Sequence, residues 1–139
     1  MTNFDEYRDV FVVADTIDDV VHPVTYELIG QARRIAKELG QLVQVMLLGE
    51  NVQAEAEELV AHGADIVHVF ESPLLKYYTT DGYTKVLTDF FEDHKPNILL
   101  IGATNNGRDL APRMSGRMQN GVSWLKLFRQ TTVHKWALF

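Results

Sequence analysis

The residues best suited to bind a ligand lie in a short polar turn, Gly102-Ala103-Thr104-Asn105-Asn106-Gly107, and in Arg108 behind it. The apolar, branched run Asn97–Ile101 comes directly before the turn and indicates a buried strand. After the turn, apolar residues recur at helical spacing: Leu110, Ala111, Met114 and Met118. A strand, a tight turn and a helix N-terminus present backbone N–H groups and a favourable dipole to an anion. We therefore predict an anion or nucleotide site formed by Gly102, Thr104, Asn105, Gly107 and Arg108.

This turn matches neither of the two common phosphate-binding motifs. It lacks the Gly-Lys-Ser/Thr ending of a Walker loop, and the spacing of Gly102 and Gly107 does not fit the dinucleotide fingerprint. The alternative interpretation is a turn without a ligand, in which Asn105 or Asn106 caps the helix.

Other polar residues give weaker signals. Asp15, Asp18 and Asp19 would suit a hard cation, although such a run is more often a solvated loop. Arg113 and Arg117 share a helix face, so they either bind a phosphate or an acidic partner or are solvated charges. The histidines have no zinc-ligand spacing, and no nucleophile lies beside a base. We therefore expect a protein without catalytic residues of its own.

Composition narrows the class of protein further. The 139 residues suffice for one domain with its own core. A net charge of -6 argues against a broad nucleic-acid surface, and the absence of cysteine excludes disulfides and thiolate metal sites. No apolar run is long enough to span a bilayer, and the N-terminus is acidic and polar. We expect a cytoplasmic protein that contacts neither membrane nor nucleic acid.

The apolar periodicity predicts strands alternating with helices. The strands span residues 9–15, 42–48, 65–70 and 97–101. The first helix is capped by Thr25 and ends at Gly40, and the second follows Val52 with Ala56, Leu59 and Val60 facing inward. The third begins near Tyr83, after a loop over residues 72–80. This alternation predicts an α/β, three-layer sandwich with a mostly parallel, Rossmann-like sheet.

Three segments follow one another in a recognisable order: HPVTYELIGQARRIAKELG, LVAHGADIVHVF and NILLIGATNNGRDLAPRMSGRM. Together they resemble the N-terminal domain of the electron transfer flavoprotein alpha subunit, an adenine nucleotide alpha-hydrolase-like fold. The resemblance covers about residues 10–118, and the third segment is the most specific.

The resemblance implies a subunit that works together with a beta subunit and FAD to carry electrons between flavin dehydrogenases and an acceptor. It also implies AMP as a nucleotide at the subunit interface, near Gly102 to Arg108. The FAD of the family sits mainly in a C-terminal domain, whose glycine- and serine-rich motif has no counterpart in this sequence. We therefore expect the chain alone to hold no FAD. The alternative is a free-standing adenine-nucleotide-binding module that forms a homo-oligomer when isolated.

The last residues differ from the rest of the chain. The family-like domain is expected over residues 1–120, and Asp109 is the last acidic residue. From Gly121 the resemblance fails, whereas codons read one base out of register from Val122 can give Leu-Leu-Ala-Glu-Ala, like the strand expected there. We predict that residues 121–139 arise from a reading-frame shift, which sequencing the gene would test. Val122 to Leu127 would still form a strand, and Arg129 to Phe139 would be irregular or rest on a neighbouring molecule.

Overall fold

The computed structural model describes residues 6–118, 128–130 and 135–138. Its main sheet has the strand order β5-β4-β1-β6-β8-β7, in which the first four strands are parallel. These four strands are β1 (Val10–Val13), β4 (Val43–Gly49), β5 (Ile66–Glu71) and β6 (Ile98–Gly102). They correspond to the four apolar runs, so the predicted mostly parallel sheet is confirmed.

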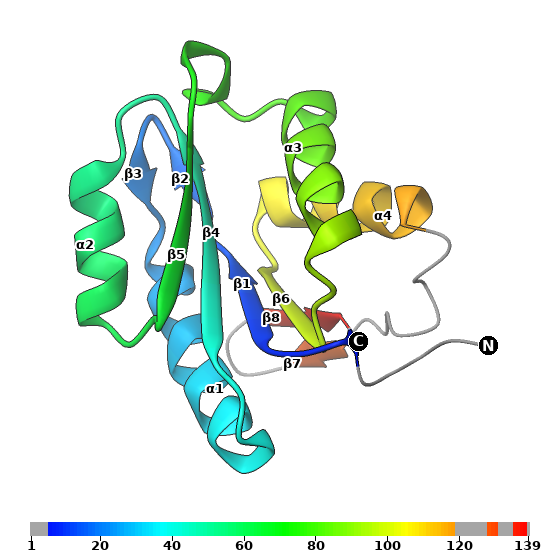
Figure 1. Cartoon of the computed structure of the whole chain (residues 1–139). Coiled ribbons are helices and arrows are strands. Elements are labelled where there is room, and N and C mark those ends of the chain that lie inside the picture. The colour runs from blue at the N-terminus through cyan, green and yellow to red at the C-terminus, as the bar shows by residue number, and fades with distance from the viewer. Residues whose placement is uncertain (1–5, 119–127, 131–134, 139) are drawn as a thin grey trace.

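Helices cover both faces of the sheet. The four helices are α1 (Pro23–Leu39), α2 (Gln53–Ala61), α3 (Thr80–Asp93) and α4 (Asn105–Arg117). Figure 1 shows α1 and α2 on one face of the sheet and α3 and α4 on the other. Alternate residues of β1 supply the two cores, because Val12 packs on the α1 side and Phe11 on the α3 side. The three-layer α/β sandwich is therefore confirmed.

The start of α1 differs from the prediction. The N-cap is His22, whose Nδ1 accepts a hydrogen bond from the Val24 N–H at 3.0 Å, and Pro23 opens the helix. Proline fixes the backbone angle that the first helical residue needs, which moves the helix start ahead of Thr25. Thr25 is instead buried inside the helix, and its Oγ1 accepts from the Asp15 N–H. Gly40 ends α1 with a φ of 64°, as predicted.

Two further details of the helices correct the predictions. Val60 is 52% exposed rather than inward, because α2 buries only a narrow face around Leu59. The third helix, α3, starts at Thr80, ahead of Tyr83, and Tyr83 is buried inside it. The preceding segment is not a plain loop, since Pro73–Leu75 form a single turn of 3₁₀ helix, η2, with Leu75 buried.

A small hairpin replaces the polar loop expected after the first strand. The strands β2 (Thr16–Ile17) and β3 (Val20–Val21) pair antiparallel. Asp18 and Asp19 form the turn with φ angles of 50° and 62°. Aspartate tolerates this left-handed conformation better than most residues, and two such residues suit a tight hairpin turn.

The C-terminal segment contains two strands where an irregular chain was expected. The strands β7 (Phe128–Gln130) and β8 (Lys135–Leu138) pair antiparallel, and β8 also pairs with β6. The prediction that Arg129 to Phe139 is irregular is therefore wrong for these strands. The physical reason is the free edge of β6, whose backbone N–H and C=O groups need partners. Val122 to Leu127, predicted as a strand, lie outside the described residues.

Candidate functional site

An open groove lies at the carboxyl ends of the neighbouring strands β1 and β6. From β1 the chain passes through α1 to β4 on one side, whereas β6 lies on the other side of β1. Ligands of open α/β sheets bind at such a switch point. The groove has a volume of about 450 Å³. Its lining comes from the starts of α1 and α4: His22, Pro23, Val24, Glu27, Ala103, Thr104 and Arg108. We call it the switch-point groove.

Thr104 determines where α4 begins. Its Oγ1 accepts a hydrogen bond from the Gly107 N–H at 3.1 Å, and its carbonyl accepts from the Arg108 N–H at 2.9 Å. The predicted capping by Asn105 or Asn106 is therefore wrong, because the threonine one residue earlier reaches the free amide first. Since α4 starts at Asn105, Arg108 lies at the end of the first turn rather than at the helix start.

The two glycines of the turn are explained by packing. A Cβ on Gly107 would lie 1.8 Å from the Gly102 carbonyl oxygen, so no side chain fits there. A Cβ on Gly102 would lie 2.9 Å from Cγ1 of Val24, which closes α1 onto the end of β6. Close packing therefore accounts for both glycines, and no bound ligand is needed to explain them.

The structure divides the predicted site residues between two sides of the turn. Thr104 and Arg108 line the switch-point groove, whereas Gly102 and Gly107 line a separate cavity of about 20 Å³. That cavity has room for little more than one water molecule. Asn105 is exposed and lines neither space, and its backbone N–H has no partner among the described residues. Sequence reasoning missed His22 and Glu27, although Pro23 signalled that a helix starts beside them.

The switch-point groove offers one cation, Arg108, to an anionic group, beside the acidic side chain of Glu27. Arg108 is exposed and makes no ion pair with any described residue, so its guanidinium is available as a bidentate donor. The groove is a poor fit for a flavin ring, because no Phe, Tyr or Trp is among the described residues that line it. The residues present would therefore hold a phosphate or a carboxylate rather than an isoalloxazine.

Comparison with known proteins assigns the chain to a family. A family model described as "Electron transfer flavoprotein domain" matches residues 10–123. The chain belongs to this family. It is 43% identical over 118 residues to the electron transfer flavoprotein subunit alpha of Megasphaera elsdenii, covering 85% of the chain and 35% of the relative. It is also 44% identical over 117 residues to subunit LctC of an NAD(+)- and ferredoxin-dependent lactate dehydrogenase of Acetobacterium woodii, covering 84% of the chain and 28% of the relative.

A third relative carries an electron-transfer name as well. The acryloyl-CoA reductase electron transfer subunit beta of Anaerotignum propionicum is 41% identical over 121 residues, covering 87% of the chain and 33% of the relative. The chain spans about a third of the length of these relatives. No helix in the described part of the electron transfer flavoprotein domain is long and apolar enough to cross a membrane.

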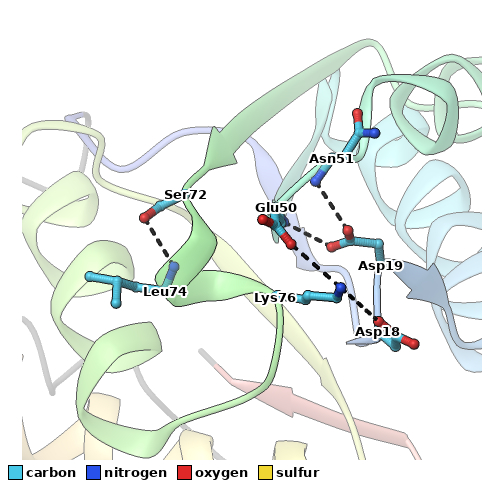
Figure 2. A network of polar contacts seen from close by, with 7 residues as sticks. All are labelled: Asp18, Asp19, Glu50, Asn51, Ser72, Leu74 and Lys76. Carbon is cyan, nitrogen blue, oxygen red and sulfur yellow. Dashed lines mark hydrogen bonds and ion pairs between the residues drawn. The ribbon is translucent and has the colours of Figure 1, made fainter.

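A second polar cluster lies at the same edge of the domain, formed by Asp18, Asp19, Glu50 and Lys76. We call it the acidic corner, and Figure 2 shows its contacts. The Asp19 carboxylate accepts the backbone N–H groups of Glu50 at 2.8 Å and Asn51 at 3.1 Å. Lys76 Nζ lies 3.8 Å from Asp18 and 3.6 Å from Glu50. These carboxylates thus have partners within the chain, and no group of three potential metal ligands occurs among the described residues.

Hydrogen bonds connect α4 to the start of α3 and to Tyr78, which precedes α3. Asp109 accepts from the Tyr78 hydroxyl at 2.6 Å and from the Thr80 hydroxyl. These bonds, that of Thr80 first, lower the pKa of Asp109, while burial raises the pKa of Tyr78. Arg113 Nη2 lies 3.4 Å from Asp81 on α3. Arg113 is therefore partly engaged, which leaves Arg108 as the better candidate of the two for an external partner.

His68 is half-buried on the edge strand β5. Its Nε2 lies 2.6 Å from Gln44 Oε1, and its ring packs against Phe90 at 4.7 Å. Burial, followed by the proximity of His94, lowers the pKa of His68 below its usual value.

Proposed function

We propose that this electron transfer flavoprotein domain is the N-terminal part of an alpha subunit that carries electrons between flavin dehydrogenases and an acceptor, together with a beta subunit and FAD. The names of the relatives and the family match support the electron-transfer role. One observation directs the proposal to a surface: Arg108 is a cation without an ion pair among the described residues, at the switch point of the sheet. In this role the domain is a carrier subunit rather than an enzyme.

Each predicted site residue has a distinct part in this proposal. Gly102 and Gly107 give the turn its tight shape, and Thr104 fixes the start of α4. The Asn105 N–H and the Arg108 guanidinium then hold an anion, either the phosphate of a nucleotide such as AMP or a carboxylate of the beta subunit. FAD supplies the redox chemistry of the complex and is held mainly outside these residues.

Copurification tests the proposal. The chain is coexpressed with its beta subunit, and the complex is captured through a tag on one partner and assayed for bound nucleotide. Arg108→Ala should lower the yield of complex or its nucleotide content by about tenfold, the loss of one charge-assisted contact. Arg117→Ala, which removes an arginine from the same helix but outside the groove, is the matched control. Equal yields and equal nucleotide content in both variants would contradict the role of Arg108.

The purified chain alone should be colourless. The described switch-point groove has no aromatic wall for a flavin ring, so visible flavin absorbance is expected only after the partner chains are added. A stoichiometric flavin spectrum from the isolated chain would count against this assignment of the cofactor.

A second candidate function is a free-standing adenine-nucleotide-binding module that forms a homo-oligomer. The observation in its favour is that the groove and Arg108 lie on this domain alone. Calorimetric titration of the isolated chain with AMP, combined with sedimentation analysis, separates the two functions. Saturable binding by an oligomer without a beta subunit favours the module, and no binding favours the carrier subunit.

A further inference from the structure

A second groove, larger than the switch-point groove, lies at the opposite edge of the sheet. It has a volume of about 540 Å³ and runs between the last turns of α1 and the end of α2. Its lining includes Gly30, Arg33, Arg34, Lys37, His62 and Asp65, together with Ala36, Gln41 and Val43. We call it the basic groove. No part of the switch-point groove contributes to it.

The basic groove is strongly cationic on an acidic chain. Arg33, Arg34 and Lys37 are all exposed, and none of them forms an ion pair with a described carboxylate. The one acidic side chain in the lining, Asp65, has its Oδ2 occupied by the Val43 N–H at 2.8 Å. Three cations are therefore gathered in one groove of a chain whose net charge is -6.

Gly30 lies in the interior of α1 without a packing reason. Glycine in a helix interior is less stable than alanine. A side chain would nevertheless fit at Gly30, since no atom lies within 4 Å of a Cβ built there. Gly116 in α4 is equally open, whereas Gly40 has a φ of 64° that favours glycine. The absent side chain leaves the α1 backbone open beside three cations, which gives another polypeptide room to lie against the helix.

Arg33 lies across the end of α2. A Cβ on Gly63 would lie 2.4 Å from Arg33 Cδ and 2.8 Å from Nη1, so the arginine occupies the space above this glycine. Arg33 is exposed, as Arg34 and Lys37 are, so the groove presents three cations of α1 to solvent.

The geometry favours an acidic protein segment over other anions. The C-terminal ends of α1 and α2 lie at this groove, and their dipoles disfavour a small anion close to the backbone. The same dipoles account for Lys37 in the last turn of α1 and for Arg33 over the end of α2, but they do not account for Arg34 or for the open Gly30. The net charge of -6 repels a long polyanion such as nucleic acid more strongly than it repels a short acidic segment. We propose that the basic groove binds an acidic segment of a partner protein.

The test uses a defined probe on the full chain. A peptide of six glutamates is titrated into isotope-labelled protein at about 0.01 M ionic strength, where the Debye length is about 30 Å. We expect the amide signals of Gly30, Arg34, Lys37 and His62 to shift. The double variant Arg34→Gln/Lys37→Gln should weaken binding about tenfold, as expected for two exposed pairs. Lys85→Gln, which removes an exposed lysine from α3, is the matched control and should bind as the unaltered chain does.

A second variant tests whether peptide binding depends on the open space of the groove or only on its positive charge. Gly30→Leu keeps every cation and suits a helix, but its side chain fills the open space, so it should also weaken peptide binding. Unshifted amides in the groove, or binding equal in all variants, overturns the proposal. Inorganic phosphate or a short DNA duplex that shifts the same amides at lower concentration than the peptide also overturns it.

Discussion

The acidic corner and the switch-point groove lie at the same edge of the sheet but differ in how their charges are satisfied. In the acidic corner, Asp19 accepts two backbone N–H groups and Lys76 lies between two carboxylates. In the switch-point groove, Arg108 has no ion pair among the described residues. A group of charges clustered in the sequence thus proves to be structural, whereas a single arginine remains available for a partner.

The difference follows from the turns that carry the charges. The hairpin turn at Asp18 and Asp19 turns the second carboxylate toward the loop after β4, where backbone N–H groups need acceptors. At the groove, Thr104 already accepts the hydrogen bond of the Gly107 N–H. The start of α4 therefore needs no contact from the Arg108 side chain.

The largest effect is expected for Gly107→Ala. A Cβ 1.8 Å from a backbone oxygen forces β6 and α4 apart, so the free energy of unfolding should fall by about 3 kcal/mol or more. Gly116→Ala in the same helix is the control, because no atom lies within 4 Å of its Cβ. It should change stability by no more than about 1 kcal/mol, in the stabilising direction. Urea unfolding measures both, and similar losses in the two variants would show that close packing of the turn is not the cause.

An intermediate effect is expected for Asp19→Ala. The substitution removes the acceptor of two backbone N–H groups and places alanine at a φ of 62°, so stability should fall by about 1–3 kcal/mol. Asp19→Asn keeps the tolerated backbone conformation and one acceptor, and it should recover part of the loss. Asp18→Asn, which weakens only an exposed contact with Lys76, should change stability by less than about 1 kcal/mol. Thermal unfolding of the three variants would contradict the comparison if Asp18→Asn were the most damaging.

A smaller effect is expected from acid, through Glu71 beside the acidic corner. Hydrogen bonds from the Gln53 side chain and then from the Val52 N–H lower the pKa of Glu71 from 4.5. A carboxylate with a lowered pKa stabilises the fold fully above its unfolded pKa, and this contribution is lost as pH falls through the folded value. Stability should therefore decline below about pH 4.5. In Glu71→Gln this part of the decline should be absent, and identical slopes for the two proteins in acid urea titrations would refute it.

The sequence predicts the sheet better than it predicts the hydrogen bonds around the sheet. The runs at β1 and β6 are apolar on both faces, so burial alone identifies them as central strands. The sequence places the cap of α4 one or two residues late, because Thr104, Asn105 and Asn106 are all able to cap and only the backbone path selects between them. The role of Asp19 was beyond local reasoning, since its partner Glu50 lies 31 residues away.

The smallest effect on stability is expected for Arg108→Ala, and this small effect is what the comparison requires. The side chain is exposed and lacks an ion pair among the described residues, so its removal should change the free energy of unfolding by no more than about 0.5 kcal/mol. An arginine retained for folding would behave like Asp19, with a clear loss of stability. Removal of an arginine that serves a partner would instead leave the unfolding curve unchanged and weaken the complex.

Arg108→Lys refines the result, because lysine keeps the charge but loses the planar fork that binds a phosphate or carboxylate through two hydrogen bonds. If Arg108→Lys weakens the complex as much as Arg108→Ala does, the fork is the part that binds. Urea unfolding of both variants, measured beside the copurification assay, separates the two roles, and a loss of stability like that of Asp19→Ala would place Arg108 among the structural charges.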